Sequence, residues 1–437
     1  MAYTDEKASK ISHIDIPKNK LIEEILKNIT IQKNNNISDA INSNLTSFSL
    51  NNKDSTIENI FVVDGSLVDY KDKLTNLEGS LIRTGMLFLD LKQYKLLEER
   101  DICHPIVKET FLNNSYGTHA TFLVFKNLKY NEKNLYDSIR YLIFDSFAKD
   151  EDLKNLPLET LKFLIFKKWE NKENNSESFE CPSCGTKTII RYNKDKDICS
   201  HCKQEVLITD FVGFHKNMNK DSDLVHSKLA NDYMLFHETM LLFSFIIKLY
   251  DFSLKHGEDK FKKTLFIKDG PLSLNGIYSK IVNYISLFLK EINNKGLSLN
   301  LVGQEKTGVF VEHFENDINK DKFFIINNDY IRKHINPSSE YSKKIYGQDT
   351  MYGSKVYVNY KNTHRLILSV NCGGIIKENP ALNDFVNLHE NITAICNLLT
   401  YKYANGIYPI SLINSRVSIS TNPSGNIIEQ FINSHIK

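Results

Sequence analysis

The sequence predicts an α/β protein in which one mixed domain is interrupted by a small insertion. Apolar, β-rich runs cluster early in the chain, near 57–64, 80–95 and 119–128, whereas helical and strand-like segments alternate after residue 226. Between these two parts, the polar stretch 170–178 is followed at once by four closely spaced cysteines. We therefore expect a mixed sheet flanked by helices, formed by two separated parts of the chain.

Composition places the chain among ordinary globular proteins. Of its 437 residues, 41% are hydrophobic and 25% are charged, and the net charge of +2 neither indicates nor excludes a nucleic-acid partner. The N-terminus lacks the apolar core of a secretory signal. The most apolar run, 240–250, is short and contains Lys248, which favours a buried helix over a membrane span. These features predict a cytoplasmic protein without a membrane segment.

An N-terminal helical arm is expected ahead of the main domain. Leu21, Ile25 and Ile29 have helical spacing, and an Asn-rich stretch follows them. The predicted boundaries are 1–55 for the arm, 56–170 for the first part of the main domain, 171–222 for the cysteine-containing insertion and 223–437 for the second part.

The same patterns predict the elements of the main domain in chain order. After the three early strands, we expect helices at 132–148 and 157–169, a long helix at 226–256, a strand at 264–269, a helix at 274–294, strands at 298–302, 308–314 and 354–370, a helix at 382–402 and a helical tail. The sequence contains no internal repeat, so we do not expect a repeat architecture.

The cysteines carry the most specific signal in the sequence. Cys181 and Cys184 form one CxxC pair, Cys199 and Cys202 form another, and fourteen residues separate the pairs. Four thiolates in two such pairs make the closed tetrahedral site of structural Zn²⁺. Flanking β-rich stretches indicate a zinc ribbon, and we expect the ion to fold it rather than to catalyse. The basic residues of the ribbon fit either a nucleic-acid contact or a solvated surface.

Three carboxylates form a second candidate site. Asp64 and Asp269 each follow a β-rich run and precede a glycine, and Glu238 lies on the apolar stripe of the helix at 226–256. Each Asp-Gly pair could instead mark a simple turn, and Glu238 could form a buried ion pair with Lys or Arg. If the three converge, their hard oxygen ligands suit Mn²⁺ or Mg²⁺. Two such ions can activate water for phosphodiester hydrolysis.

Strand-borne aspartates with a helix-borne glutamate are the arrangement of RNase H-like nucleases, and the local motifs resemble the NurA nuclease family. The resemblance rests on four stretches that occur in the order of the family, which are FVVDGS (61–66), FIKDGPL (266–272), LVGQEKTG (301–308) and NGIYPISLINSRVSIS (405–420). It extends over the main domain, residues 56–437, apart from the cysteine insertion.

This resemblance implies an RNase H-like fold and Mn²⁺-dependent endo- and exonuclease activity on DNA. It also implies a homodimer that works with a HerA-type hexameric ATPase, which translocates DNA, in DNA end processing or antiviral defence. By motif position, Asp64 and Asp269 match the metal-binding aspartates of the family, and Glu238 matches its helical glutamate. Lys306 matches the lysine after the next strand, and Tyr408 matches the tyrosine of the late segment.

One position departs from the family pattern. Family members carry a histidine a few residues after the late tyrosine, where this chain has Asn414, and asparagine cannot act as an acid or base at neutral pH. The fourth ligand would then be weaker, or would come from His389 or Glu390. The alternative function is a weak or inactive DNA-binding scaffold subunit.

Basic residues beside the motifs are candidate contacts to DNA phosphates. Lys268, Lys306 and Arg416 have this position, although each could instead pair with a carboxylate. The chain has neither GxxxxGK[ST] nor GxGxxG, so the energy for movement along DNA would come from a partner.

Overall fold

The computed structural model describes most of the chain. The described residues are 19–29, 37–50, 55–72, 76–98, 116–127, 129–150, 153–218, 228–274, 276–336, 344–400, 405–419 and 426–435. They include every predicted site residue, whereas part of the predicted N-terminal arm lies outside them.

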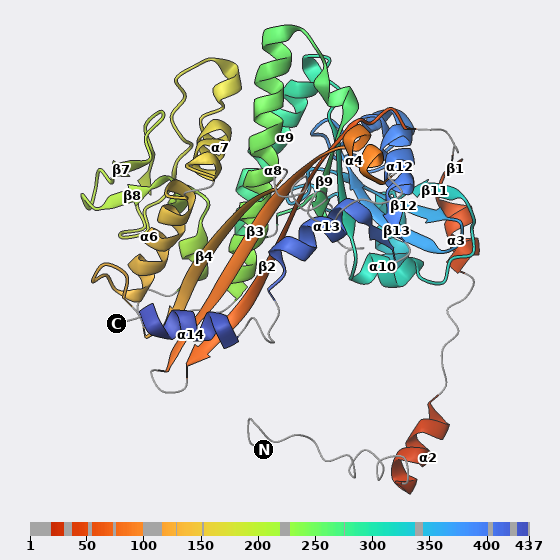
Figure 1. Cartoon of the computed structure of the whole chain (residues 1–437), viewed down its shortest axis with the longest axis horizontal. Helices are drawn as coiled ribbons and strands as arrows, with labels where there is room; N and C mark the ends of the chain where they lie inside the picture. The colour runs from red at the N-terminus through yellow and green to blue at the C-terminus, as the bar shows by residue number, and fades with distance from the viewer. Residues whose placement is uncertain are drawn as a thin grey trace.

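A nine-stranded mixed sheet forms the centre of the molecule (Figure 1). Its strands in spatial order are β1 (Ser47–Ser49), β11 (Lys322–Ile325), β12 (Ser354–Tyr360), β13 (His364–Val370), β10 (Asn300–Glu305), β9 (Thr264–Asp269), β2 (Asn59–Asp72), β3 (Leu77–Asp90) and β4 (Tyr116–Lys126). Early and late strands lie in the same sheet, so the two separated parts of the chain contribute to one sheet.

Five neighbouring strands have the arrangement expected of an RNase H-like fold. β2, β3 and β4 form an antiparallel meander. β9 lies parallel to β2 on its other side, and β10 lies parallel to β9. The predicted α/β fold with a mixed sheet is confirmed, and β2 lies where the meander meets the parallel strands.

Helices cover both faces of the sheet (Figure 1). The core on one face includes α6 (Leu135–Ala148), α7 (Leu156–Ile165), α8 (Lys228–His256) and α9 (Ser279–Asn294), and the core on the other includes α12 (Leu388–Asn397) and α13 (Tyr408–Val417). The side chains of β2 alternate between them, since Phe61 and Val63 belong to the first core and Val62 to the second. A continuous apolar run is therefore needed in this strand.

The long helix α8 is a core helix. Among the described residues it is the one helix that is long and apolar enough to cross a membrane, but 67% of its most apolar 18-residue window is buried inside the protein. Its Phe245 stacks on Phe61 of β2, with ring centroids 4.6 Å apart. The apolar run at 240–250 is thus buried against the sheet, as the sequence predicts.

The sequence predicts that the strand β2 ends at Asp64. In the structure, β2 continues to Asp72. β3 pairs with it along its whole length, whereas its last pair with β9 joins Val63 to Lys268. Asp64 therefore lies in the middle of a long strand, at the level where the parallel part of the sheet ends. The prediction of a strand end was wrong because pairing with β3 outweighs the turn preference of Asp-Gly.

The predicted strand at 308–314 is also wrong, because this segment is the helix α10 (Val309–Phe314). Its Phe310 and Phe314 are buried at helical spacing, so aromatic packing decides the conformation over the β propensity of the valines. The predicted strand at 354–370 is a hairpin, since β12 and β13 pair antiparallel.

The described part of the N-terminal arm contains two helices and one strand. α2 (Lys20–Asn28) has no buried side chain, whereas Ile41 of α3 (Ile37–Asn44) is fully buried beside α10. β1 adds a short strand to the edge of the sheet by pairing with β11. In Figure 1, α2 lies apart from the rest of the molecule, while α3 lies against it.

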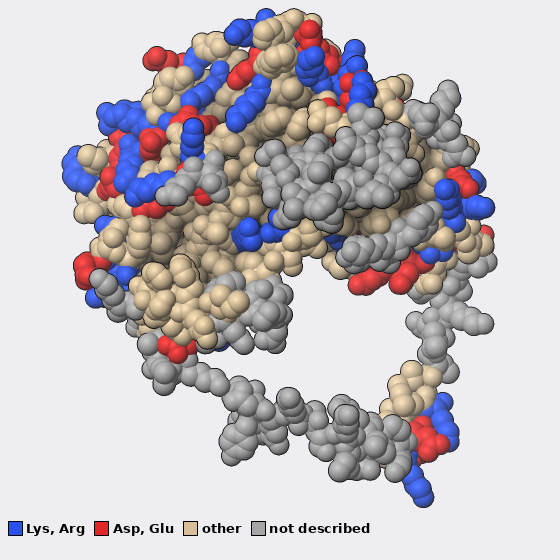
Figure 2. All heavy atoms as spheres, viewed as in Figure 1, with Lys and Arg blue, Asp and Glu red and all other residues tan. Residues whose placement is uncertain are grey.

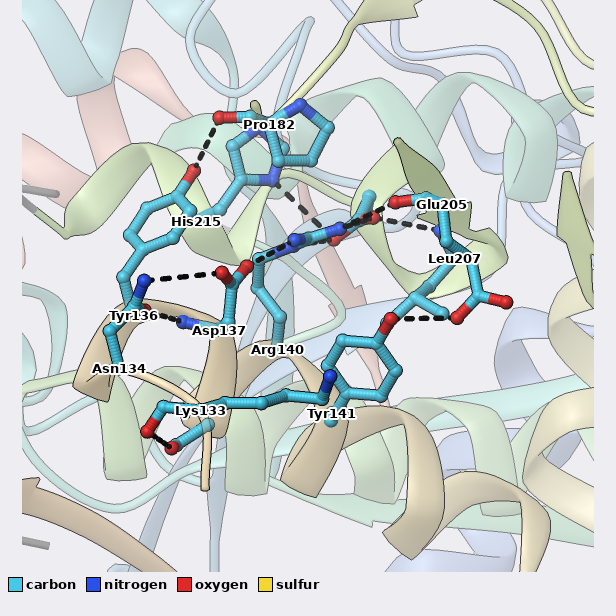
Figure 3. A network of polar contacts seen from close by, with 12 residues as sticks. Lys133, Asn134, Tyr136, Asp137, Arg140, Tyr141, Pro182, Glu205, Leu207 and His215 are labelled. Carbon is cyan, nitrogen blue, oxygen red and sulfur yellow. Dashed lines mark hydrogen bonds and ion pairs between the residues drawn. The ribbon is translucent and has the colours of Figure 1, made fainter. Parts of the chain in front are cut away.

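The cysteine insertion packs on the helix layer. It contains two small hairpins, β5 (Phe179–Glu180) with β6 (Lys187–Thr188) and β7 (Lys196–Ile198) with β8 (Glu205–Leu207). Arg140 of α6 donates two hydrogen bonds to Asp210, at 2.9 and 2.6 Å, just beyond β8 (Figure 3). Ile190 and Val206 are fully buried in the core that contains α8. A buried ion pair and shared apolar contacts thus hold the insertion.

Candidate functional site

Asp64 is a buried carboxylate in the middle of β2. Only 6% of the residue is exposed. Its Oδ1 accepts a hydrogen bond from the Gly65 backbone N–H at 2.8 Å, and its Oδ2 has no hydrogen-bond partner among the described residues. Burial, together with the charges of Asp269 and Glu238, raises the pKa of Asp64 to about 8. The three predicted carboxylates therefore lie close enough to act on one another's charge.

The two aspartates lie on the face of the sheet that α13 covers. Gly85 of β3 pairs with Asp64, and a Cβ atom at Gly85 would lie 2.5 Å from Val417 of α13. Directly opposed residues of an antiparallel pair point to the same face, so Asp64 points toward α13. Asp269 follows Lys268, which pairs with the residue before Asp64, and by alternation it points to the same face.

Glu238 reaches this place from α8 on the opposite face. A Cβ atom at Gly65 would lie 2.5 Å from Glu238 Oε1 and 2.9 Å from Met234 Cγ. Gly65 is therefore required by the close approach of α8, not by a turn. Because Gly65 has no side chain, the Glu238 carboxylate lies close to the backbone of β2 at the residue that follows Asp64. Burial raises the pKa of Glu238 to about 7, although Lys268 opposes this shift.

Lys268 is the partner of Glu238. Its Nζ lies 3.5 Å from Glu238 Oε2, and both side chains are almost fully buried. The buried ion pair that the sequence left open as an alternative is therefore present. With 1% of its surface exposed, Lys268 cannot reach a DNA phosphate, so it is not the phosphate contact that the sequence suggested.

Lys306 is the partner of Asp269. Its Nζ lies 2.5 Å from Asp269 Oδ2, and 42% of its side chain is exposed. The pairing of β9 with β10 brings the two residues together, because Gln304 of β10 is opposite Asp269. Gly270 then turns the chain away with φ of 103°, and its N–H donates to the Gln304 carbonyl oxygen at 2.8 Å.

Two cavities meet at Lys306. The larger has a volume of about 640 Å³ and is also lined by Asp269, Gly308 and Tyr346. The smaller has a volume of about 440 Å³ and is lined on its other side by Asn414 of α13. Lys306 and Asn414 therefore face the same space, and Asp269 opens on the adjoining one.

The carboxylates are spaced more widely than the cysteines. Among the described residues, the four cysteines are the one group of three or more metal-ligating side chains whose ligand atoms all lie within 4.8 Å of one another. The three carboxylates still fit a hard cation. Asp64 Oδ2 is a buried oxygen that accepts no hydrogen bond, and Glu238 Oε2 is a buried oxygen that lies 3.5 Å from Lys268 Nζ. Such oxygens are ligands for Mn²⁺ or Mg²⁺, and without a cation the burial of Asp64 is costly.

Tyr408 and Arg416 belong to α13 but have other contacts. The Tyr408 hydroxyl accepts a hydrogen bond from the Tyr94 hydroxyl at 2.5 Å. The Arg416 guanidinium lies 5.1 Å from the centroid of the Tyr116 ring. Both residues help to hold α13 against α4 (Leu91–Glu98) and β4, and neither contacts a carboxylate of the site in the described structure.

His389 and Glu390 of α12 have other contacts in the structure. His389 packs edge-on against Phe323, with ring centroids 5.1 Å apart. Glu390 Oε1 accepts hydrogen bonds from the Thr56 backbone N–H at 2.7 Å and from its hydroxyl at 3.0 Å. The suggestion of a fourth ligand from this helix is therefore wrong, and Asn414 itself occupies the position near Lys306.

The four cysteines form a compact cluster. Cys181 Sγ lies 3.7 Å from Cys202 Sγ, and Cys184 Sγ lies 3.8 Å from Cys199 Sγ. A tetrahedral ion with metal–sulfur bonds of about 2.3 Å separates its ligands by about 3.8 Å, so the spacing suits four thiolates on one ion. In each half of the cluster a backbone N–H, from Gly185 or Lys203, donates to the carbonyl oxygen of the first cysteine.

No protein-family model and no curated protein matches the chain. Solved structures of NurA are similar to it over nearly its whole length. The NurA nuclease from Sulfolobus solfataricus is 10% identical, with a TM-score of 0.37 over 98% of this chain and 97% of that one. A structure of NurA bound to dAMP and manganese is 12% identical, with a TM-score of 0.29 over 98% of both chains. Because these TM-scores are below 0.5, we base the function on the geometry of this chain.

Proposed function

We propose that this chain is a metal-dependent nuclease that hydrolyses phosphodiester bonds of DNA. The observation that carries the proposal is the pair of aspartates at the end of the parallel strands, beside Lys306 and its two cavities. Ligands of open α/β sheets bind at this end of the strands. The cavities give an extended substrate room on both sides of Lys306.

Asp64, Asp269 and Glu238 would hold one or two Mn²⁺ or Mg²⁺ ions. When bound, such ions activate water and stabilise the leaving oxygen of a phosphodiester. The raised pKa values of Asp64 and Glu238 support this role, because burial and mutual repulsion leave both carboxylates without enough positive charge nearby. Asp269 already accepts a cation, the Lys306 ammonium.

Lys306 and Asn414 would contact the phosphates of the substrate. Once Asp269 binds a metal ion, the half-exposed Lys306 can turn to a phosphate oxygen, which lysine binds as a point charge. Asn414 is exposed on α13 at the smaller cavity, and its amide N–H can donate to the same strand. Tyr408 would position α13 through its hydrogen bond with Tyr94.

A non-catalytic DNA-binding or scaffold subunit is the second candidate function. It is favoured by the two lysine–carboxylate contacts, which supply positive charge to Glu238 and Asp269 without a metal ion. Asn414 also favours it, because an amide cannot replace the family histidine as an acid or base.

Cleavage of linear DNA in Mn²⁺ or Mg²⁺ tests the proposal. We expect Asp64→Ala and Asp269→Ala to lower the cleavage rate by about 100-fold or more while the protein stays folded. Glu173→Ala, which removes an exposed carboxylate from the polar linker, is the matched control and should cleave like the wild type. A wild-type protein that binds DNA but never cleaves it, with either ion, would support the scaffold function instead.

We further propose that the nuclease works in the cytoplasm as a homodimer with a HerA-type hexameric ATPase, in DNA repair or antiviral defence. The motif resemblance and the lack of a GxxxxGK[ST] motif support an external source of translocation energy. The cysteine cluster would bind structural Zn²⁺. Cleavage in the presence of the hexamer, with and without ATP, tests the partnership, which fails if neither the hexamer nor ATP alters the rate.

A further inference from the structure

A small cavity lies between the cysteine insertion and α9, outside the carboxylate site. Its volume is about 210 Å³. Pockets that enclose a whole small-molecule ligand are larger, with volumes of about 300–1,000 Å³. It has room for one group of a larger molecule. Three lysines line it, namely Lys187 of β6, Lys280 of α9 and Lys216.

Lys280 has an unusual environment for an ammonium group. Its Nζ lies 3.6 Å from the centroid of the Phe211 ring and donates a hydrogen bond to the Ser178 carbonyl oxygen at 3.4 Å. Among the described residues, no carboxylate forms an ion pair with it. Burial lowers the pKa of Lys280 to about 8, the Lys216 charge adds to this shift, and Glu177 opposes it. An anion in the cavity would stabilise the charged form.

The acidic side chains at the cavity already have partners. Glu180 pairs with Lys216 at 2.9 Å. Asp210 accepts two hydrogen bonds from Arg140 of α6. These pairs leave the Lys280 charge uncompensated at close range.

His215 adds a neutral hydrogen-bonding group to the lining. Only 7% of the residue is exposed, and its Nδ1 makes no hydrogen bond to a described residue, lying 4.0 Å from Asp210 Oδ1. Burial lowers the pKa of His215 to about 4, so the ring is neutral at pH 7. A neutral imidazole keeps one N–H donor, and an anionic oxygen can accept from that N–H and from an ammonium together.

We propose that this cavity binds one phosphate group of a nucleic-acid strand, at a site separate from the carboxylates. A tetrahedral anion matches the uncompensated ammonium, the neutral ring donor and the size of the cavity. On the face seen in Figure 2, Lys and Arg alternate with Asp and Glu over the insertion and the neighbouring helices, so that face offers no continuous basic surface. Binding of DNA at the cavity would therefore depend on a few specific phosphate contacts, and each contact contributes to the salt dependence of the affinity.

Fluorescence anisotropy with a labelled DNA duplex, without added Mn²⁺ or Mg²⁺, tests the site in the full chain. We expect Lys280→Gln to weaken binding about fivefold or more and to lower the slope of log affinity against log salt by about 1. Lys290→Gln removes an exposed charge from the same helix and should change the affinity less than twofold. Lys280→Arg keeps the charge and should restore binding, and unchanged melting temperatures show that the variants are folded.

Acylation of Lys280 with and without inorganic phosphate identifies the source of the anion. Protection by both DNA and inorganic phosphate supports the proposal. Protection by inorganic phosphate alone, with an unchanged DNA affinity of Lys280→Gln, overturns it in favour of a free anion. No protection by either probe, with unchanged DNA affinity, removes the site altogether. Because no step requires cleavage, these outcomes are independent of the nuclease activity proposed for the carboxylates.

Discussion

Replacing Gly65 with alanine should push the Glu238 carboxylate away from β2 and Asp64 without removing either carboxylate. The new Cβ atom would lie 2.5 Å from Glu238 Oε1, whereas ordinary contact begins at 3.4 Å. The carboxylate must therefore withdraw by roughly 0.9 Å, because Met234 Cγ at 2.9 Å blocks other adjustments of the strand. A misplacement of about 1 Å costs about 100-fold in rate, and overpacking costs about 1–3 kcal/mol in the free energy of unfolding.

Two measurements check this expectation, namely single-turnover cleavage of labelled DNA and calorimetric titration with Mn²⁺. We expect Gly65→Ala to cleave about 100-fold more slowly and to bind Mn²⁺ more weakly. Gly117→Ala is the control, because the Cβ atom added to this β4 residue would lie 2.7 Å from the flexible Met86 Cε of β3 and not against the carboxylates. If Gly65→Ala binds Mn²⁺ and cleaves like the wild type, Glu238 is only the buried partner of Lys268.

Three further outcomes follow from the same geometry. Burial raises the pKa of Asp64 to about 8 and that of Glu238 to about 7, so the metal-free folded state binds more protons than the unfolded chain between about pH 4 and 8. Its free energy of unfolding, measured in denaturant titrations, should therefore fall as the pH rises across this window, and it should fall less for Asp64→Asn. The affinity for Mn²⁺ should rise over the same window. A free energy of unfolding that does not change with pH in the wild type contradicts this expectation. Cys181→Ser should lose the bound zinc and lower the melting temperature, measured by metal analysis and calorimetry, and an unchanged melting temperature would show that the ion does not support the fold. Arg140→Met leaves Asp210 buried without its cation and should cost about 3–5 kcal/mol in the free energy of unfolding, and a cost below about 1 kcal/mol would refute this account.

The features that could be predicted from the sequence are those that short stretches determine. The CxxC pairs place their thiols through local turns, so the four-cysteine cluster appears where the spacing indicates it. Asp269 ends its strand as predicted because Gly270 and Pro271 follow it. Lys306 was identified only through the resemblance of its motif, and its place beside Asp269 depends on the parallel pairing of β9 with β10.

The features that could not be predicted depend on contacts between distant segments. Asp-Gly at Asp64 looks like a turn, but β3 pairs through it, and Gly65 is needed because α8 crosses at that point. The partner of Glu238 is Lys268, which no spacing in the sequence connects to it. Both facts require knowing which face of β2 the helix α8 covers, and that is a property of the packed core.

The distribution of positive charge singles out Asp64 among the three carboxylates. Glu238 has Lys268 on the α8 face, and Asp269 has Lys306 on the α13 face. Asp64 lies between them with one unpartnered oxygen and the largest rise in pKa. A cation therefore gains most at Asp64, and its charge would loosen Lys306 from Asp269 toward the two cavities. We infer that metal and substrate binding are coupled through Lys306, because a cation bound at Asp269 would compete with the ammonium for the carboxylate and leave more of its N–H donors for a phosphate.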